Sequence, residues 1–334
     1  MRIIIPMAGM GTRMRPHTLT IPKPLLPVAG KPIVQRLVEE IAGVVNEKID
    51  EISFVIGKFG KSVEDKLISI AKEQGAKGSI YYQEEALGTA HAVLCAGPSL
   101  KGKTIVAFAD TLFKAEFKIE DDCEASIWVQ KVDNPSSFGV VKLNDNGYIT
   151  DFIEKPQNFV SDLAIIGIYY FASGEDLKNE LQALVDNKQM VKGEYQLTDA
   201  LENLKNKGTK FTPGQVSEWL DCGNKDATVY TNQRILEYLG KEKELINKAL
   251  MNNSVIIQPC FIDSDVKITN SVIGPHVSIG KGTVIDQSVI SNSIIQANSK
   301  INHANFSNSM IGNFAEIQMK AKNLSIGDYN QLKD

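Results

Sequence analysis

The chain of 334 residues carries 36 lysines and arginines against 40 aspartates and glutamates, which gives a formal net charge of −4. This balance excludes a strongly basic nucleic-acid-binding protein and a surface built to bind acidic membranes, so any basic cluster is local. The apolar run before Pro6 is too short for a secretory signal, and no later run of the sequence reaches membrane-spanning length. We therefore predict a cytoplasmic protein, and its length favours two structural units.

Short β-rich runs alternate with amphipathic helical patterns in the first part of the chain. Strands are expected at 2–7, 52–57, 79–83 and 104–109, and helices at 32–45, 61–74 and 89–96. This alternation predicts a Rossmann-like, mostly parallel α/β sheet with helices on both faces. In such a sheet ligands bind beyond the carboxyl ends of the strands.

The alternation of strands and helices stops after residue 124, where strand patterns follow one another without helices between them. These strands are expected at 125–132, 139–143, 148–153 and 163–171. They predict an antiparallel extension of the sheet. Further along we expect helices at 174–188 and 197–207, a strand ending at Asp221, and a long amphipathic helix at 226–250.

An internal repeat begins after Met251. An apolar residue, mostly isoleucine, recurs every five or six positions from Ile256 to Ile317, with Gly, Asn, Ser and Asp between them. This period is typical of a parallel β-helix, in which each coil places an aliphatic side chain on the coil below. The pattern resembles the left-handed hexapeptide-repeat β-helix. We predict a first domain at 1–250, which contains the α/β sheet, and a β-helix domain at 251–334.

The stretch after the first strand, residues 7–32, combines glycines, basic side chains and prolines. A dinucleotide-binding fingerprint would need a glycine where Met14 stands and an acidic residue where Gly57 stands, and no P-loop spacing is present. What remains is a glycine-rich turn followed by Arg13, with Lys23 further along a proline-stiffened loop. Exposed backbone N–H groups, a guanidinium fork and a lysine charge together suit a triphosphate.

The sequences GMGTRMRP at 9–16, PKPLLPV at 22–28 and Lys31-Pro32 resemble the sugar-nucleotide pyrophosphorylases. These sugar-1-phosphate nucleotidyltransferases join a sugar 1-phosphate to an NTP. The resemblance is greatest to the glucose-1-phosphate thymidylyltransferases and uridylyltransferases, and it extends over residues 1–240. Members of the family also carry a C-terminal repeat of the kind seen here.

The resemblance implies a role for each matching residue. Arg13 would bind the departing pyrophosphate, Lys23 the α-phosphate and Lys155 the sugar phosphate, with no protein nucleophile. Residues implied to bind the nucleotide are Ala8, Gly9, Gly11, Thr12, Gln83 and Gly88, and those implied to bind the sugar are Gly139, Glu154 and Glu194.

Two aspartates, Asp110 and Asp221, each end an expected strand. Carboxylates at the ends of two strands over one crevice suit a hard divalent cation that keeps waters and bridges phosphates. With the basic loop beside them, they predict a Mg²⁺ site.

The choice of base is expected to rest on Gln83, which ends a strand just before Gly88. A primary amide can donate and accept, so it can pair with O4 and N3–H of uracil or thymine. The LGTAHAV sequence at 87–93 favours uridylyl transfer, whereas the loop at 18–28 is closer to thymidylyl- and mannose-1-phosphate guanylyltransferases. His91 and His17 are expected to be hydrogen-bonded structural residues without a chemical role.

The predicted reaction condenses glucose 1-phosphate with dTTP or UTP to give an NDP-sugar and pyrophosphate. Mannose-1-phosphate guanylyltransferase and N-acetylglucosamine-1-phosphate uridylyltransferase remain open as alternatives. An acyltransferase is disfavoured because neither His276 nor His303 lies in an acetyltransferase-like motif, and the short solenoid favours homo-oligomer assembly instead. An inactive regulatory subunit is disfavoured because the implied phosphate-binding and metal-binding side chains are all present.

Overall fold

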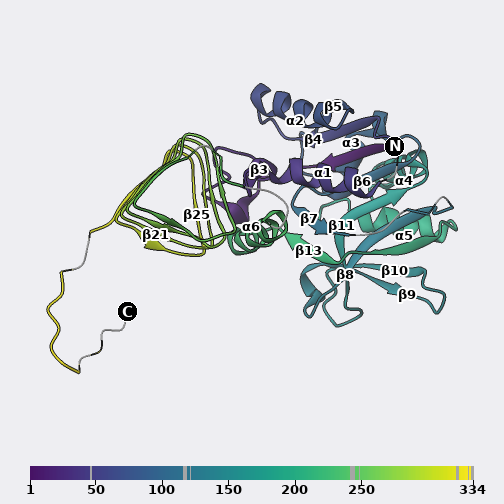
Figure 1. The fold of residues 1–334 in the computed structure, drawn as a ribbon. Helices are drawn as coiled ribbons and strands as arrows, with labels where there is room; N and C mark the ends of the chain where they lie inside the picture. Colours follow the sequence, from purple (N-terminus) through teal and green to yellow (C-terminus); the bar gives the residue numbers. More distant parts are fainter. Residues whose placement is uncertain are drawn as a thin grey trace. The chain divides into compact units, whose positions relative to one another are not determined.

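The computed structural model describes residues 1–45, 47–115, 119–120, 122–240, 245–247, 249–320, 323–329 and 331. By its internal contacts the chain divides into two compact units (Figure 1). The first comprises Met1–Leu26 with Lys31–Ala227, and the second comprises Pro27–Gly30 with Thr228–Asp334. No helix among the described residues is long and apolar enough to cross a membrane.

The first unit is built around a nine-stranded sheet. Its main path runs in the order β10 (Ile149–Glu154), β9 (Gly139–Leu143), β11 (Leu163–Phe171), β6 (Thr104–Ala107), β1 (Arg2–Pro6), β4 (Glu51–Ile56) and β5 (Lys77–Tyr82). Off this path, β8 (Ala125–Lys131) pairs with β11 and with β12 (Phe211–Gln215). Strands β1, β4, β5 and β6 are mutually parallel, whereas β11 runs antiparallel to β6, β8 and β9. The predicted α/β sheet with an antiparallel extension is confirmed.

Helices and short strands complete the first unit. They are α1 (Ile33–Val44), α2 (Lys61–Glu73), α3 (Thr89–Cys95), α4 (Gly174–Asp186), α5 (Leu197–Asn206), the short strand β3 (Lys31–Pro32), and the two-stranded sheet of β7 (Thr111–Lys114) with β13 (Glu218–Asp221). Within the described part of the chain, four single-turn 3₁₀ helices lie at Thr12–Met14, Lys23–Leu25, Gly97–Ser99 and Pro135–Ser137. The short strand β2 (Pro27–Val28), with Ala29 and Gly30, belongs to the second unit by contacts.

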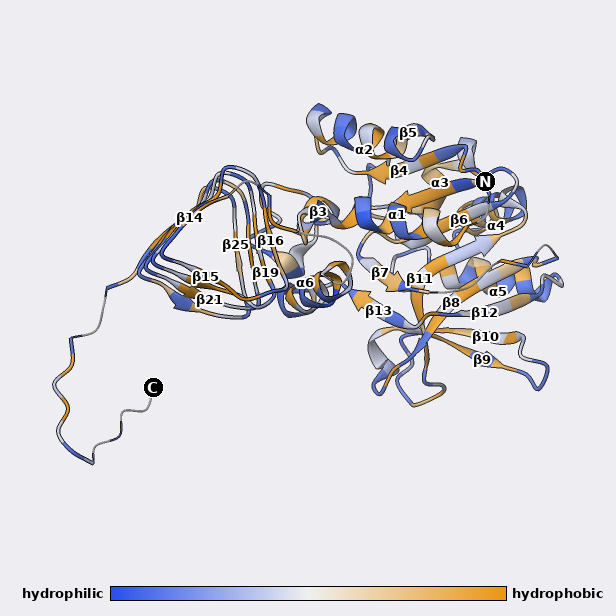
Figure 2. Cartoon of the chain, viewed as in Figure 1, coloured by the Kyte–Doolittle hydropathy of each residue, from blue (hydrophilic) through white to orange (hydrophobic). Residues whose placement is uncertain are grey.

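The central strands are apolar because both faces of the sheet are covered. Ile3, Ile4 and Ile5 of β1 are fully buried, and β4 is buried along its whole length. Figure 2 shows these strands mainly in orange, whereas the outer side of α2 is blue. A continuous apolar run is the pattern expected of a strand buried on both faces.

The second unit contains a triangular parallel β-helix (Figure 1). Its three sheets are β14 (Leu250–Asn252), β17 (Lys267–Thr269), β20 (Val284–Asp286), β23 (Lys300–Asn302) and β26 (Glu316–Gln318); β15 (Val255–Ile256), β18 (Val272–Ile273), β21 (Val289–Ile290) and β24 (Asn305–Phe306); and β16 (Cys260–Ile262), β19 (Val277–Ile279), β22 (Ser293–Ile295) and β25 (Ser309–Ile311). The repeat architecture predicted from the isoleucine spacing is confirmed.

The isoleucines stack because equivalent positions of successive coils pair in register. Ile262 pairs with Ile279, Ile279 with Ile295, and Ile295 with Ile311. The corners between the faces carry residues with positive φ, including Asp265, Gly282, Asn298 and Phe314. Asp, Asn and Gly adopt this left-handed conformation at low cost, which explains their recurrence between the apolar positions.

The long helix predicted at 226–250 is wrong in its C-terminal part. Helix α6 (Lys225–Leu239) ends before Gly240, and Leu250 already begins strand β14. Residues 241–244 and 248 of the predicted range lie outside the described residues. The first coil starts earlier than the repeat suggested, since Ile246 forms a parallel bridge with Ile262. Most of α6 groups by contacts with the second unit, although the sequence analysis assigns it to the first domain.

The segment Pro27–Gly30 is held inside the second unit. The backbone N–H of Ala29 donates to Oδ1 of the buried Asn232 at 2.9 Å, and Ser278 Oγ donates to the same oxygen at 2.7 Å. Gly30 has φ +83, and a Cβ atom there would lie 2.2 Å from the ring of Phe261. Glycine is therefore required at this position by both conformation and space.

Candidate active site

The glycine-rich turn follows β1 directly and lines a cavity of about 400 Å³ in the first unit. Gly11 has φ +58, and a Cβ atom there would lie 3.0 Å from Cβ of Lys23. Its carbonyl accepts a hydrogen bond from Thr18 Oγ1 at 2.8 Å, which closes the loop. A Cβ atom at Gly9 would meet nothing within 4 Å, so the backbone there is open to a ligand.

Lys23 is the most buried cation of the cavity. Its Nζ donates to Asp110 Oδ2 at 2.8 Å, and its side chain is 9% exposed while that of Asp110 is 40% exposed. The lysine is held by the single turn Lys23–Leu25, and Asp110 comes three residues after the end of β6. The ion pair therefore joins the proline-rich loop to the carboxyl end of a central strand.

The two predicted metal-binding aspartates lie next to one another. Strands β7 and β13 pair so that Asp221 faces Thr111, and the N–H of Cys222 donates to the carbonyl of Asp110 at 2.9 Å. Burial raises the pKa of Asp221, and the charge of Asp110 raises it further, while Lys23 and Arg13 act in the opposite direction. An ionised pair of this kind favours a cation between the carboxylates.

The donor set at the aspartates fits a cation that keeps part of its water shell. Among the described residues, no group of three or more His, Cys, Asp and Glu side chains could hold a metal ion. Two carboxylates with open positions are typical of Mg²⁺, which retains waters and binds substrate phosphates. A closed structural zinc site would need four ligands.

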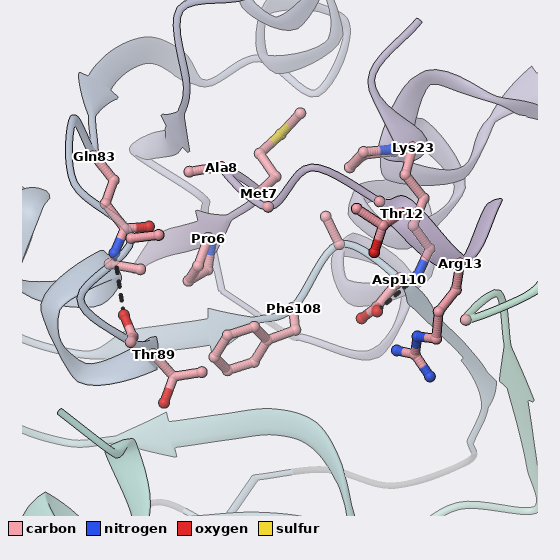
Figure 3. A pocket seen from close by; sticks show the side chains of 18 of the residues that line it. Pro6, Met7, Ala8, Thr12, Arg13, Lys23, Gln83, Thr89, Phe108 and Asp110 are labelled. Carbon is pink, nitrogen blue, oxygen red and sulfur yellow. Dashed lines mark hydrogen bonds and ion pairs between the residues drawn. The ribbon is translucent and has the colours of Figure 1, made fainter. Parts of the chain in front are cut away.

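The cavity has two chemically different ends (Figure 3). Gln83 and Thr89 lie on one side, and Arg13, Lys23 and Asp110 lie on the other, with the end of β1 between them. One end presents an amide and the other presents cations and a carboxylate. An elongated ligand with a polar ring at one end and phosphates at the other matches this distribution.

A second cavity of about 200 Å³ adjoins the first, because Thr89 and Phe108 line both. Its lining includes Gly139 and Glu154, two of the residues predicted to bind the sugar. A Cβ atom at Gly139 would lie 3.0 Å from Glu154 Oε2, so the glycine leaves room for this carboxylate.

The structure brings most of the predicted site residues to these two cavities. Those lining the first are Ala8, Gly9, Gly11, Thr12, Arg13, Lys23, Gln83, Gly88, Asp110 and Glu194. Glu194 thus lines the first cavity, although it was expected at the sugar, and Gln196 Nε2 donates to its Oε2 at 3.0 Å. Lys155 lines neither cavity; its Nζ lies 3.3 Å from Glu154 Oε1 and its side chain is 66% exposed. Asp221 also lies outside both linings.

Of the residues that line the second cavity, the sequence analysis predicted only Gly139 and Glu154. Those that it missed include Phe108, Tyr169, Gln196 and Thr198. Thr198 Oγ1 is buried and has no hydrogen-bond partner among the described residues. The pKa of Tyr169 is raised, first by burial and then by the charge of Glu154. Of these residues, only Phe108 could have been found from the sequence. It lies in the expected strand at 104–109, two residues before Asp110.

A protein-family model described as "Nucleotidyl transferase" matches residues 2–238. The chain belongs to this family. The matched range contains every residue of both cavities, and the predicted sugar-phosphate nucleotidyltransferase is confirmed at the level of the family. Members of this family generally use divalent metal ions.

Several relatives align over nearly the whole chain. The low-salt glycan biosynthesis nucleotidyltransferase Agl11 of Haloferax volcanii is 28% identical, with 100% of both chains covered. A glucose-1-phosphate thymidylyltransferase of Streptomyces griseus is 27% identical over 100% of this chain and 99% of its own. The bifunctional protein GlmU of Methanococcus maripaludis is 30% identical over 93% of this chain and 77% of its own.

A solved structure, UDP-glucose pyrophosphorylase complexed with UDP-glucose, superposes with a TM-score of 0.57 at 24% identity. The match covers 71% of this chain and 98% of that one. It shows the nucleotidyltransferase fold for a portion of the chain comparable in size to the first unit.

Proposed function

We propose that the protein condenses a sugar 1-phosphate, glucose 1-phosphate in the first instance, with dTTP or UTP. An oxygen of the sugar phosphate attacks the α-phosphorus, and a new P–O bond forms. The bond from this phosphorus to the bridging oxygen of the β-phosphate breaks, and pyrophosphate leaves with the electron pair. The products are an NDP-sugar and pyrophosphate.

The phosphate end of the first cavity carries the groups this reaction needs. Arg13 binds the departing pyrophosphate and Lys23 binds the α-phosphate, so that both contact oxygens on which negative charge grows. Backbone N–H groups around Gly9 and Gly11 contact the remaining phosphate oxygens. Charge stabilisation of this kind, rather than a covalent intermediate, is the main source of rate in phosphoryl transfer.

The second cavity takes the sugar in this proposal. Glu154 accepts hydrogen bonds from sugar hydroxyls, and the backbone of Gly139 lies along the ring. Lys155, paired with Glu154 and largely exposed, turns toward the sugar phosphate when the substrate is present. The shared residues Thr89 and Phe108 mark the point where the sugar phosphate meets the nucleotide.

Mg²⁺ is the proposed metal, with Asp110 and Asp221 as its protein ligands. When bound, it would neutralise phosphate charge and supply a Lewis acid at the α-phosphate. The raised pKa of Asp221 supports the fit, because a cation relieves the cost of holding a second carboxylate beside Asp110.

The observation that carries the proposal is the sharing of Thr89 and Phe108 by two cavities, one with an amide and a cation cluster and the other with Glu154. The test is pyrophosphate release from ATP, GTP, CTP, UTP and dTTP with the 1-phosphates of glucose, N-acetylglucosamine, mannose and galactose, in the presence of Mg²⁺. Release with dTTP or UTP and glucose 1-phosphate is the expected result. Release with GTP and mannose 1-phosphate alone would replace the proposed substrates. No release with any pair would favour a regulatory subunit.

Self-association through the β-helix remains a prediction. Val255, Val272 and Val289 form an in-register ladder on one face, and Val255 and Val289 are more than half exposed. An apolar ladder on the outside of a sheet is a surface suited to a second copy. Sedimentation velocity on the full chain decides between a homo-oligomer and a monomer.

A further inference from the structure

The side-chain amide of Gln83 makes two hydrogen bonds through its nitrogen. Nε2 donates to the carbonyl of Gly88 at 3.1 Å (Figure 3) and lies 3.2 Å from His91 Nδ1. Gln83 and Gly88 line the first cavity, whereas His91, the third residue of α3, is outside its lining. The histidine therefore contacts the amide without lining this cavity.

The identity of the two acceptors fixes the orientation of the amide. A backbone carbonyl only accepts, so the atom facing Gly88 is the nitrogen and not the oxygen. An amide nitrogen only donates, so His91 accepts at Nδ1 and carries its own proton on Nε2. Both hydrogens of Gln83 Nε2 are then used, and Oε1 remains as the only group that the side chain offers to a ligand.

The carbonyl of Gly88 is itself held in place. Gly88 has φ +103, and a Cβ atom there would lie 2.5 Å from the carbonyl oxygen of Tyr195. Tyr195 in turn donates its N–H to Leu87 and accepts from Ala90, at 2.8 and 3.0 Å. The Gly88 carbonyl also accepts from the N–H of Ala92 at 3.1 Å, so it faces two donors. It has no freedom to turn and accommodate a flipped amide.

We propose that His91 is a specificity-determining residue that holds Gln83 as an acceptor toward the base. This inference rests on the proposed function, which places the base beside Gln83. An acceptor at this position pairs with N3–H of uracil or thymine and is repelled by the lone pair at N3 of cytosine. The same rule admits N1–H of guanine and rejects N1 of adenine. It excludes CTP and ATP and leaves the choice between UTP and dTTP to other contacts.

Two expectations from the sequence change, one for the amide of Gln83 and one for His91. The amide of Gln83 was expected to donate to O4 as well as to accept from N3–H, but both of its hydrogens are already used within the protein. His91 was expected to have no chemical role, yet it supplies the second of the two acceptors that orient the base-reading side chain. Its effect passes through Gln83, so it is a positioning residue.

The test compares kcat/KM for UTP and CTP, and the equilibrium binding of both nucleotides, in four variants of the full-length protein. H91F keeps an aromatic ring and removes the acceptor, and H91A removes the acceptor with less bulk in case the phenylalanine disturbs α3. H91N returns an acceptor oxygen near the position of Nδ1. H303N, on a corner of the β-helix, is the matched control, because it makes the same chemical change in the second unit.

Wild type is expected to prefer UTP over CTP by about 100-fold, since a site with an opposed hydrogen-bond partner rejects its analogue strongly. H91F and H91A should lower this preference about tenfold, mainly through a higher KM for UTP, because one of two orienting bonds is lost. H91N should restore it to within about threefold of wild type. H303N should leave it unchanged.

An unchanged UTP/CTP ratio in folded H91F and H91A would overturn the role of His91, whatever their overall activity. A wild type that binds CTP as well as UTP would overturn it too. If the protein binds UTP selectively, loses that selectivity in H91F, and yet turns over no NTP, the proposed function fails and the base-selection inference stands.

Discussion

The two units reach their buried interiors by different routes. In the β-helix, each buried isoleucine rests on the equivalent residue one coil earlier, as Ile279 rests on Ile262. In the first unit, Asp221 lies beside Asp110 only because β13 pairs with β7. One interior depends on a repeated local spacing, and the other depends on pairing between distant parts of the chain. A substitution in the stacked interior of the β-helix is therefore expected to affect stability. A substitution at the strand ends of the first unit, where the two aspartates lie, is expected to affect chemistry.

The largest expected effect is on turnover. Replacing Lys23 with alanine removes the buried cation of the phosphate end and should lower kcat by about 10²–10³-fold, as loss of a charge-stabilising donor does elsewhere. The measurement is steady-state pyrophosphate release with the substrates identified by the panel. Lys61→Ala, an exposed lysine on α2, is the control and should leave kcat unchanged. A Lys23→Ala enzyme within threefold of wild type would remove the lysine from the mechanism.

The second-largest expected effect is on the stability of the β-helix. Ile279 is fully buried, and Ile279→Ala should lower the free energy of unfolding of the second unit by about 3 kcal/mol through lost burial and a cavity. Both tryptophans, Trp128 and Trp219, lie in the first unit, so fluorescence follows that unit alone while circular dichroism follows both. In urea, Ile279→Ala should therefore move the unfolding transition seen by circular dichroism to lower urea concentration and leave the fluorescence transition unchanged.

The exposed neighbour Val284 provides the matched control for this stability experiment. Val284→Ala should change the free energy of unfolding by less than about 0.5 kcal/mol, since its side chain already contacts solvent. A loss at Val284 equal to that at Ile279 would show that the stacked interior is not what holds the coils together.

The smallest expected effect is on the free energy of unfolding and on its dependence on pH, and it concerns Asp221. Because its pKa is raised, the ionised carboxylate is disfavoured in the folded protein. This cost is fully present above the folded-state pKa, declines as the pH falls from there, and is gone below the pKa of the unfolded chain. Without metal, Asp221→Asn should therefore raise the free energy of unfolding by about 1 kcal/mol at neutral pH. The gain should vanish as the pH falls and the wild-type carboxyl becomes neutral.

Mg²⁺ should reverse the order of stability of wild type and Asp221→Asn, since only wild type keeps both carboxylates. Thermal unfolding with and without Mg²⁺ measures this. Asp145→Asn, on an exposed turn, should respond to neither pH nor metal differently from wild type. An Asp221→Asn protein with unchanged Mg²⁺ dependence of turnover would rule out the two-carboxylate site.

Most of the secondary structure was predictable because it depends on local pattern. The strand at Leu163–Phe171 was predicted with its observed bounds, and helix α2 differs from its prediction by one residue. The prediction at 226–250 failed because an amphipathic pattern continued past Gly240 into residues that pair as strands. Periodicity alone does not distinguish a helix face from the first coil of a solenoid when neighbouring coils supply the hydrogen bonds.

The sequence by itself determined the β-helix and the glycine-rich loop after the first strand, since each depends on residues close together in the chain and on their backbone preferences. Only the tertiary structure decided that Lys23 pairs with Asp110, that Glu194 lines the first cavity, and that His91 contacts the amide of Gln83. Those relations depend on which strands and helices are neighbours in space, and on which hydrogen-bond donors are already used within the protein.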